Sequence, residues 1–83
     1  MTRVAVMSVI VENSESVEKL NNLLHESGEY IIGRMGIPYR EKGINIISIA
    51  IDAPQDIISA LSGKIGKLDG VSSKAAYSNV AKK

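Results

Sequence analysis

The segment "GEYIIGRMGIPYREKGINIISIAID" (residues 28–52) lies in the middle of the chain and decides its fold. It contains two apolar runs on either side of "PYREKG" (residues 38–43), which holds a proline, a glycine and three charged residues. Two apolar runs joined by a short loop of this composition are typical of an antiparallel β-hairpin. We therefore expect two paired strands, at residues 29–37 and 44–52.

A strand and a helix precede this hairpin. The sequence "RVAVMSVIV" (residues 3–11) is rich in β-branched residues in both alternating registers, as in a strand that is buried on both sides. Asn13 or Ser14 is a suitable N-cap, apolar residues then recur at helical spacing, and Gly28 is a natural C-terminal stop. The predicted helix spans residues 15–27.

A second helix and a final strand follow the hairpin. Pro54 suits the start of a helix, because its missing N–H costs nothing there, and "LDG" (residues 68–70) ends that helix. "VSSKAAYSNV" (residues 71–80) reads as a weaker strand with polar residues on one face. The order βαββαβ, with right-handed crossovers, predicts an α+β ferredoxin-like fold. We expect a single domain, residues 1–83, with a four-stranded antiparallel sheet and both helices on one face.

Both faces of the predicted sheet are apolar. In the first and third strands, one face would carry Val4, Val6, Ile10, Ile44, Ile46 and Ala50, and the other Ala5, Met7, Val9, Val11, Ile47, Ile49 and Ile51. Two helices can cover only one face, and the other would be a large exposed apolar patch. The sequence therefore predicts a homo-oligomer, a dimer or a tetramer, that assembles through the sheet.

The composition argues against several classes of function. The chain has no cysteine, which excludes disulfides, thiolate catalysis and iron–sulfur ligation by its own residues. Its net charge of +1 provides no electrostatic footprint for nucleic acid. No apolar run is long enough to span a membrane, and the N-terminal segment lacks the cleavage site of a signal peptide. We expect a cytoplasmic protein that binds neither nucleic acid nor membranes directly.

The sequence shows no catalytic or metal-binding constellation. His25 is the only histidine, and one histidine cannot assemble a metal site without further ligands. Glu12, Glu15 and Glu18 are better explained by helix capping and solvation than as paired catalytic carboxylates. We therefore expect no enzymatic activity, no metal site and no cofactor.

The block "GRMGIPYR" (residues 33–40) allows two interpretations. In the first, Gly33 and Gly36 mark a bulge or close backbone packing inside a strand. In the second, the glycines let a ligand or a neighbouring chain approach, Arg34 and Arg40 supply planar donors for an anion, and Tyr39 adds a stacking face.

The same block begins a wider resemblance. "YIIGRMGIPYREKGINIISIAIDAP" (residues 30–54) and "DIISALSGKIGKLDGVSSKAAYS" (residues 56–78) closely resemble the small proteins named as regulators of the iron-only hydrogenase system. Residues 33–40 are the most specific part, supported by "DAP" at 52–54 and "SGKIG" at 62–66. This family is similar to ACT domains and to the C-terminal regulatory domain of nickel-responsive repressors. Both are ferredoxin-like folds that assemble through their sheets and bind small effectors between subunits.

The resemblance has limits. Nickel-responsive domains use several histidines and a cysteine as ligands, which this chain lacks, so a nickel site of that kind is not expected. Those repressors also carry a separate DNA-binding segment for which no residues remain here, so any role in transcription would require a partner. By analogy with ACT domains, which hold an amino acid near the loop after the first strand, the matching positions are Glu12, Asn13 and Ser14. Asn13 and Ser14 equally suit helix capping.

Two functions follow from these observations. The first is a non-enzymatic regulatory or sensor domain that works as a homo-oligomer and binds a small effector, such as an amino acid, at subunit interfaces. The second is a structural adaptor that docks on a partner protein without any small ligand. Arg34, Tyr39 and Arg40 separate the two, since they should converge on a pocket in the first and face outward in the second.

Overall fold

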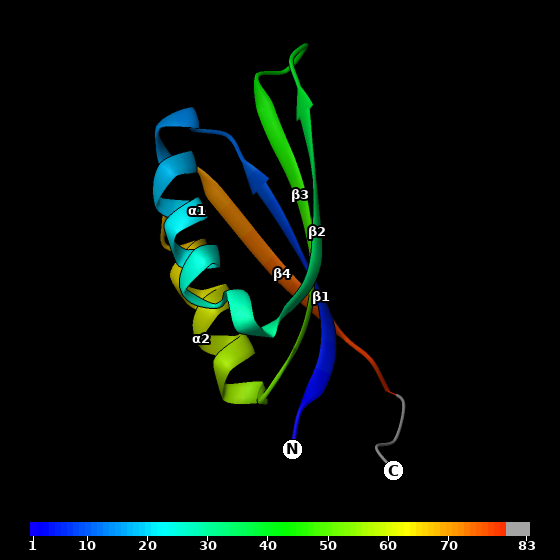
Figure 1. Cartoon of the computed structure of the whole chain (residues 1–83). Helices are drawn as coiled ribbons and strands as arrows, with labels where there is room; N and C mark the ends of the chain where they lie inside the picture. Colours follow the sequence, from blue (N-terminus) through cyan, green and yellow to red (C-terminus); the bar gives the residue numbers. More distant parts are fainter. Residues whose placement is uncertain (80–83) are drawn as a thin grey trace.

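The computed structural model describes residues 1–79, which form a four-stranded sheet with two helices packed against one face (Figure 1). In chain order the elements are β1 (Arg3–Val11), the 3-10 turn η1 (Ser14–Ser16), α1 (Val17–Glu26), the 3-10 turn η2 (Gly28–Tyr30), β2 (Ile31–Tyr39), β3 (Ile44–Ala53), α2 (Gln55–Gly66) and β4 (Val71–Tyr77). All strand pairs are antiparallel, in the order β2-β3-β1-β4. The predicted α+β ferredoxin-like fold is confirmed.

The first helix begins later than predicted. The Asn13 side chain caps η1 by accepting a hydrogen bond from the Glu15 N–H at 3.0 Å, and the α-helical pattern starts only at Val17. At the other end Ser27 is the C-cap, and Gly28 opens η2 instead of ending the helix in a left-handed conformation.

The predicted bounds of the second strand, residues 29–37, are wrong by two residues at each end. Its first two residues belong to η2, whereas Pro38 and Tyr39 pair with β3 and leave only residues 40–43 for the turn. Pro38 is tolerated because β2 is an edge strand, where a missing N–H need not break a ladder hydrogen bond. Gly43 closes the turn with a φ of +66°. The last strand ends at Tyr77; Val80, which we predicted to belong to it, lies outside the described residues.

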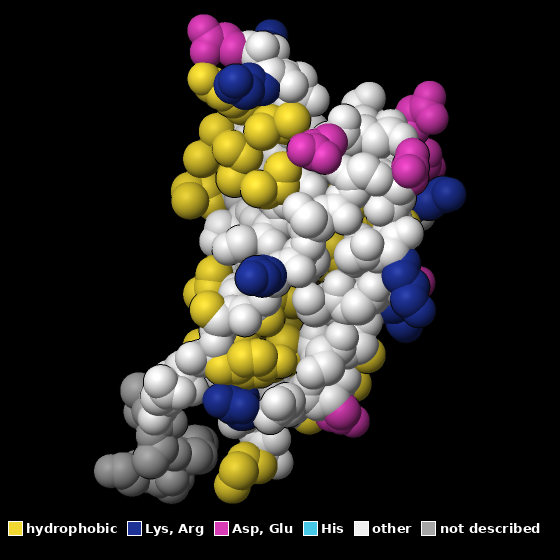
Figure 2. All heavy atoms as spheres, turned by 180° about the vertical axis from the view of Figure 1, so that it is seen from behind, with side chains coloured by type: hydrophobic (Ala, Val, Ile, Leu, Met, Phe, Trp, Pro, Cys, Tyr) yellow, Lys and Arg dark blue, Asp and Glu magenta, His cyan; other side chains and the backbone are white. Residues whose placement is uncertain are grey.

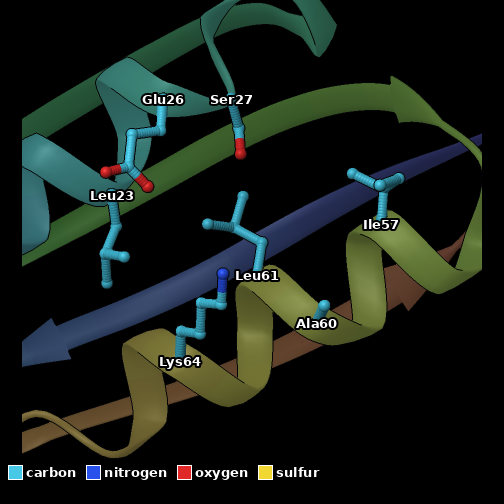
Figure 3. Close-up of a pocket in the computed structure, with 7 residues that line it drawn as sticks. All are labelled: Leu23, Glu26, Ser27, Ile57, Ala60, Leu61 and Lys64. Carbon is cyan, nitrogen blue, oxygen red and sulfur yellow. The ribbon is translucent and has the colours of Figure 1, made fainter.

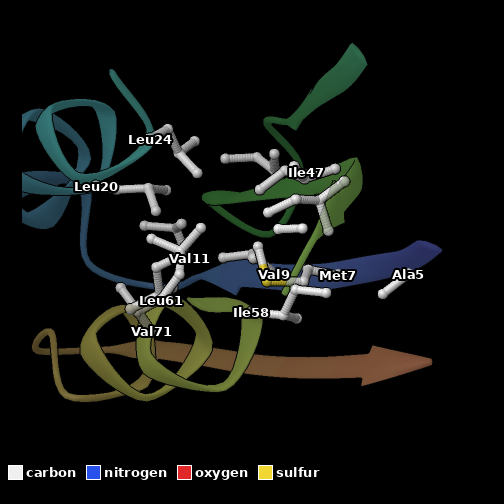
Figure 4. Packing of buried hydrophobic residues seen from close by; sticks show 14 residues of the cluster. Ala5, Met7, Val9, Val11, Leu20, Leu24, Ile47, Ile58, Leu61 and Val71 are labelled. Carbon is white, nitrogen blue, oxygen red and sulfur yellow. The ribbon is translucent and has the colours of Figure 1, made fainter. Parts of the chain in front are cut away.

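The core lies between the helices and one face of the sheet (Figure 4). The seven residues predicted for the inner face are all buried, and α1, α2 and β4 add Leu20, Leu24, Ile58, Leu61, Ile65 and Val71. Each fully buried large aliphatic side chain contributes about 1.5–3 kcal/mol relative to an exposed one. On the opposite face Val4, Val6, Ile10 and Ile46 remain 40–43% exposed. The predicted division of the sheet into a covered and an uncovered apolar face is therefore correct.

Neither α1 nor α2 is long and apolar enough to span a membrane.

Candidate functional site

The largest unexplained feature is the sheet face away from the helices, which we call the open face. Apart from Met1, every large hydrophobic residue that is exposed among residues 1–79 comes from the sheet: Val4, Val6, Ile10, Ile32, Met35, Ile37, Tyr39 and Ile46. Hydrophobic side chains form separate patches on this side of the molecule, with polar surface between them (Figure 2). An apolar surface of this extent is typical of an interaction site.

Strand register arranges the open face in rows that cross the sheet. From β2 to β4, one row consists of Ile37, Ile46, Ile10 and Ser72, which we call the large row. The next consists of Met35, Ser48, Ser8 and Lys74, the polar row. The third consists of Gly33, Ala50, Val6 and Ala76, the small row. The hydrophobic character of the face is thus interrupted by one polar row that contains a lysine.

A second feature is a groove between α1 and the edge strand β2, on the helix side of the sheet. Arg34 crosses it and donates a hydrogen bond from Nη2 to Asn21 Oδ1 at 3.1 Å. On one side of Arg34 lies a cavity of about 320 Å³ that includes His25, and on the other a cavity of about 250 Å³ that includes Gly36 and Asn45. We call this the edge groove. The volume of each cavity is near the lower limit for small-molecule sites.

No close contact among residues 1–79 requires glycine at positions 33 and 36. A β-bulge lies between Ile31 and Gly33, as one of the two interpretations predicted. Among residues 1–79, a Cβ atom added at either glycine would meet nothing within 4 Å, so the predicted close backbone approach is not found there. The backbone of β2 is therefore open to a neighbouring molecule at these two positions.

The loop after β1 is fixed by the loop before β4. Asn13 donates a hydrogen bond from Nδ2 to Asp69 Oδ2 at 2.7 Å, in addition to capping η1, and the Glu12 N–H donates to the Gly70 carbonyl at 2.6 Å. Both polar groups of the Asn13 side chain are therefore engaged in holding the loop. The Glu12 and Ser14 side chains are exposed beside it.

Tyr39 and Arg40 lie at the tip of the β2–β3 hairpin, which extends beyond the N-terminal end of α1 (Figure 1). The Tyr39 hydroxyl donates a hydrogen bond to Glu41 Oε1 at 2.7 Å, and this bond is the main cause that raises the pKa of Tyr39. Tyr39 belongs to the open face, whereas Arg34 lies on the helix side. A single chain does not bring Arg34 and Tyr39 together, and their shared role in ligand binding stays a prediction.

A small pocket of about 90 Å³ lies between the helices (Figure 3). Leu23 and Leu61 supply apolar walls, while Glu26 from α1 and Lys64 from α2 provide opposite charges. No sequence motif indicates this pocket, because it depends on how two amphipathic helices pack. It is well below the volume of typical ligand sites.

His25 is exposed at the edge groove. Among residues 1–79, no three histidine, aspartate or glutamate side chains gather closely enough to hold a metal ion.

Comparison with known proteins agrees with the resemblance read from the sequence. Residues 3–75 match the model of the TM1266-like family, described as "Iron-only hydrogenase system regulator, putative". The chain belongs to this family. The structure of the uncharacterized protein TM1266 from Thermotoga maritima is 33% identical, with a TM-score of 0.89, over 93% of this chain and 98% of that one. The TM1266-like fold is therefore shared along nearly the whole length of both proteins.

A more distant similarity concerns the fold alone. A formyltetrahydrofolate deformylase from Pseudomonas putida KT2440 is 12% identical, with a TM-score of 0.67, over 93% of this chain but only 29% of the deformylase. The TM1266-like chain thus corresponds in fold to a domain-sized part of that enzyme. None of the curated protein sequences compared with the chain is significantly similar to it.

Proposed function

We propose that this TM1266-like chain is a non-enzymatic regulatory domain of the iron-only hydrogenase system that acts as a cytoplasmic homo-oligomer and binds a small effector at subunit interfaces. The open face is the observation that supports assembly. Its exposed side chains include Ile32 at 64%, Met35 at 61% and Ile37 at 50%, all on the edge strand β2, with Ile32 at its bulge. Burying such side chains provides about 25 cal/mol per Å² of apolar surface.

The effector site that we propose is the edge groove, where Arg34 supplies a guanidinium and Gly36 leaves the backbone of β2 accessible, while Gly33 lies on the open face. The groove is open along the free edge of the sheet, so a neighbouring subunit could complete it. The loop residues Glu12, Asn13 and Ser14 and the hairpin residues Tyr39 and Arg40 lie at the hairpin end of the molecule (Figure 1). They would reach a shared site only if a second subunit brought its own copies close.

Assembly is tested by sedimentation velocity at micromolar concentration. The wild type should be a dimer or tetramer, and Ile46→Asp should be a folded monomer, because it places a carboxylate in the open face without entering the core. Ala60→Asp, on the exposed side of α2, is the matched control and should assemble as the wild type does. A wild type that is monomeric throughout would refute the proposed interface.

Effector binding is tested by a thermal-shift screen of metabolites, since a ligand that binds only the folded state raises the melting temperature. Arg34→Ala and Arg40→Ala should each weaken an anionic effector by about 1.5–3 kcal/mol if a charged hydrogen bond is lost. Arg40→Ala should change stability by no more than about 0.5 kcal/mol, as for an ordinary surface substitution. Unchanged affinity in both variants would exclude these arginines from the site.

The second candidate is a structural adaptor without a small ligand, and the projecting hairpin favours it. Tyr39 and Arg40 are exposed at a tip that reaches past the helices (Figure 1). The adaptor alternative predicts that no metabolite shifts the melting temperature and that Arg40→Ala weakens binding to a partner protein.

A further inference from the structure

The polar row poses a problem for assembly through the open face. Lys74 is the charged residue in the three central rows, and its side chain forms no ion pair or hydrogen bond within residues 1–79. Its neighbours along the row, Ser8 and Ser48, are neutral hydroxyls. If two copies pair through this face, each contributes one unpaired ammonium, which is costly to remove from water.

The rows on either side indicate how two copies would pair. The large row presents Ile37, Ile46 and Ile10, whereas the small row presents Gly33, Ala50 and Val6 on the same three strands. A two-fold axis that runs along the polar row places the large row of one copy over the small row of the other. Ile37 then lies over Gly33, Ile46 over Ala50, and Ile10 over Val6 of the second copy.

This axis also satisfies the general rules of sheet packing. Strands of the two copies stay roughly aligned, as in face-to-face sheets that are about 10 Å apart. A two-fold axis parallel to the strands would instead place Ile46 over Ile10 and Ala50 over Val6. Large residues would then meet large ones and small residues small ones, which leaves gaps that close packing disfavours.

The favoured axis places the polar row over itself, so that Lys74 of one copy faces Lys74 of the other. We propose that these two lysines, with the hydroxyls of Ser8, form an oxyanion site that exists only in the dimer and makes assembly through the open face depend on a bound anion. The ligand class is a small dianion with carboxylate or phosphate oxygens, because ammonium and hydroxyl groups both donate hydrogen bonds to such oxygens. The inference rests on the proposed assembly through the sheet.

The position of Lys74 makes this site accessible. β4 is an edge strand, so the anion would enter and leave at the rim of the interface without separation of the two sheets. Anion concentration would then set the fraction of dimer, since a ligand that binds one state of an equilibrium shifts the equilibrium toward that state.

Sedimentation equilibrium with chloride, inorganic phosphate or succinate at equal ionic strength tests the site. We expect phosphate or succinate to lower the dimer dissociation constant at least about tenfold relative to chloride, and comparison of the two identifies the preferred oxyanion. Lys74→Met keeps an unbranched side chain only one atom shorter and removes its charge, so it should dimerise more tightly in chloride and no longer respond to either anion. Lys64→Met, on the helix side, should behave as the wild type. An unchanged anion response in Lys74→Met would overturn the proposal.

The pairing geometry has an independent test. Ile46→Ala and Ala50→Ile should each weaken the dimer, by leaving a gap and by overfilling the small row, respectively. The double variant exchanges the large and small positions and should restore dimerisation only if residue 46 of one copy faces residue 50 of the other. Failure of the double variant to recover would refute this axis.

If Ile46→Asp leaves assembly unchanged, the open face is not the interface and the proposed function fails. If Ile46→Asp abolishes assembly while the anions have no effect on the wild type, only the oxyanion site fails.

Discussion

Substitution of Gly70 should destabilise the protein more than the same substitution of Gly43, although both glycines have nearly equal backbone angles. Their φ values are +69° and +66°, so alanine at either position suffers the left-handed strain of about 1–2 kcal/mol. A Cβ at Gly43 would meet nothing within 4 Å, whereas a Cβ at Gly70 would lie 2.7 Å from the Cβ and 3.0 Å from the backbone nitrogen of Asn13. Since Asn13 must move, its cap on η1 is lost as well, at about 1 kcal/mol.

We therefore expect Gly43→Ala to lose about 1–2 kcal/mol and Gly70→Ala about 2–3 kcal/mol. Urea unfolding followed by circular dichroism measures both, at one fixed protein concentration because assembly would couple to stability. The effect of alanine on the unfolded chain is the same in both variants and cancels in the difference. Losses that agree within about 0.5 kcal/mol would show that Gly70 and Asn13 do not approach each other in this way.

Gly36→Val should fold with a stability within about 0.5 kcal/mol of the wild type, because its Cβ would meet nothing within 4 Å among residues 1–79, while reduced assembly or effector binding would reveal a neighbour at β2. Ser16→Ala should lose about 1–2 kcal/mol in urea unfolding, since its buried hydroxyl donates a 2.6 Å hydrogen bond to the chain segment before β4; no loss would contradict that bond. Glu41→Gln should lower the pKa of Tyr39, as measured by ultraviolet titration. The pKa of Tyr39 in the folded state is raised above 10.0, so the hydrogen bond to Glu41 stabilises the fold fully below pH 10, and this stabilisation is lost as pH rises through the raised pKa. Nickel should not bind at submicromolar affinity by calorimetry, and one-to-one binding would show that His25 has ligand partners beyond those that residues 1–79 of one chain provide.

The sequence was sufficient for properties that repeat locally. Alternation with a period of two identified the buried and uncovered faces of β1 and β3, and the loop composition identified the hairpin. These patterns are local, because each side chain is assigned to a face by its immediate neighbours in the chain. The ends of the strands and helices depend on tertiary context as well. Proline in a polar segment is typical of a turn, yet Pro38 pairs in β2 because that strand lies at an edge of the sheet.

The candidate sites depended on contacts between distant segments. Arg34 was recognised as a possible anion donor, but its partner Asn21 and the edge groove became evident only when α1 was placed beside β2. Gly70 reads as an ordinary turn glycine until the loop before β4 is packed against Asn13.

The sequence alone was sufficient to show that two strands each have a second apolar face that the helices cannot cover. The expectation of assembly follows from that. The large, polar and small rows were decided only by tertiary structure, because they join residues as far apart as Ser8 and Lys74 through strand register. A shift of register by two residues would keep every side chain on the same face and every local pattern intact, yet it would place Ser8 and Ser48 in different rows. Long-range hydrogen-bond pairing, and not local alternation, therefore put one lysine and two serines across the middle of the open face.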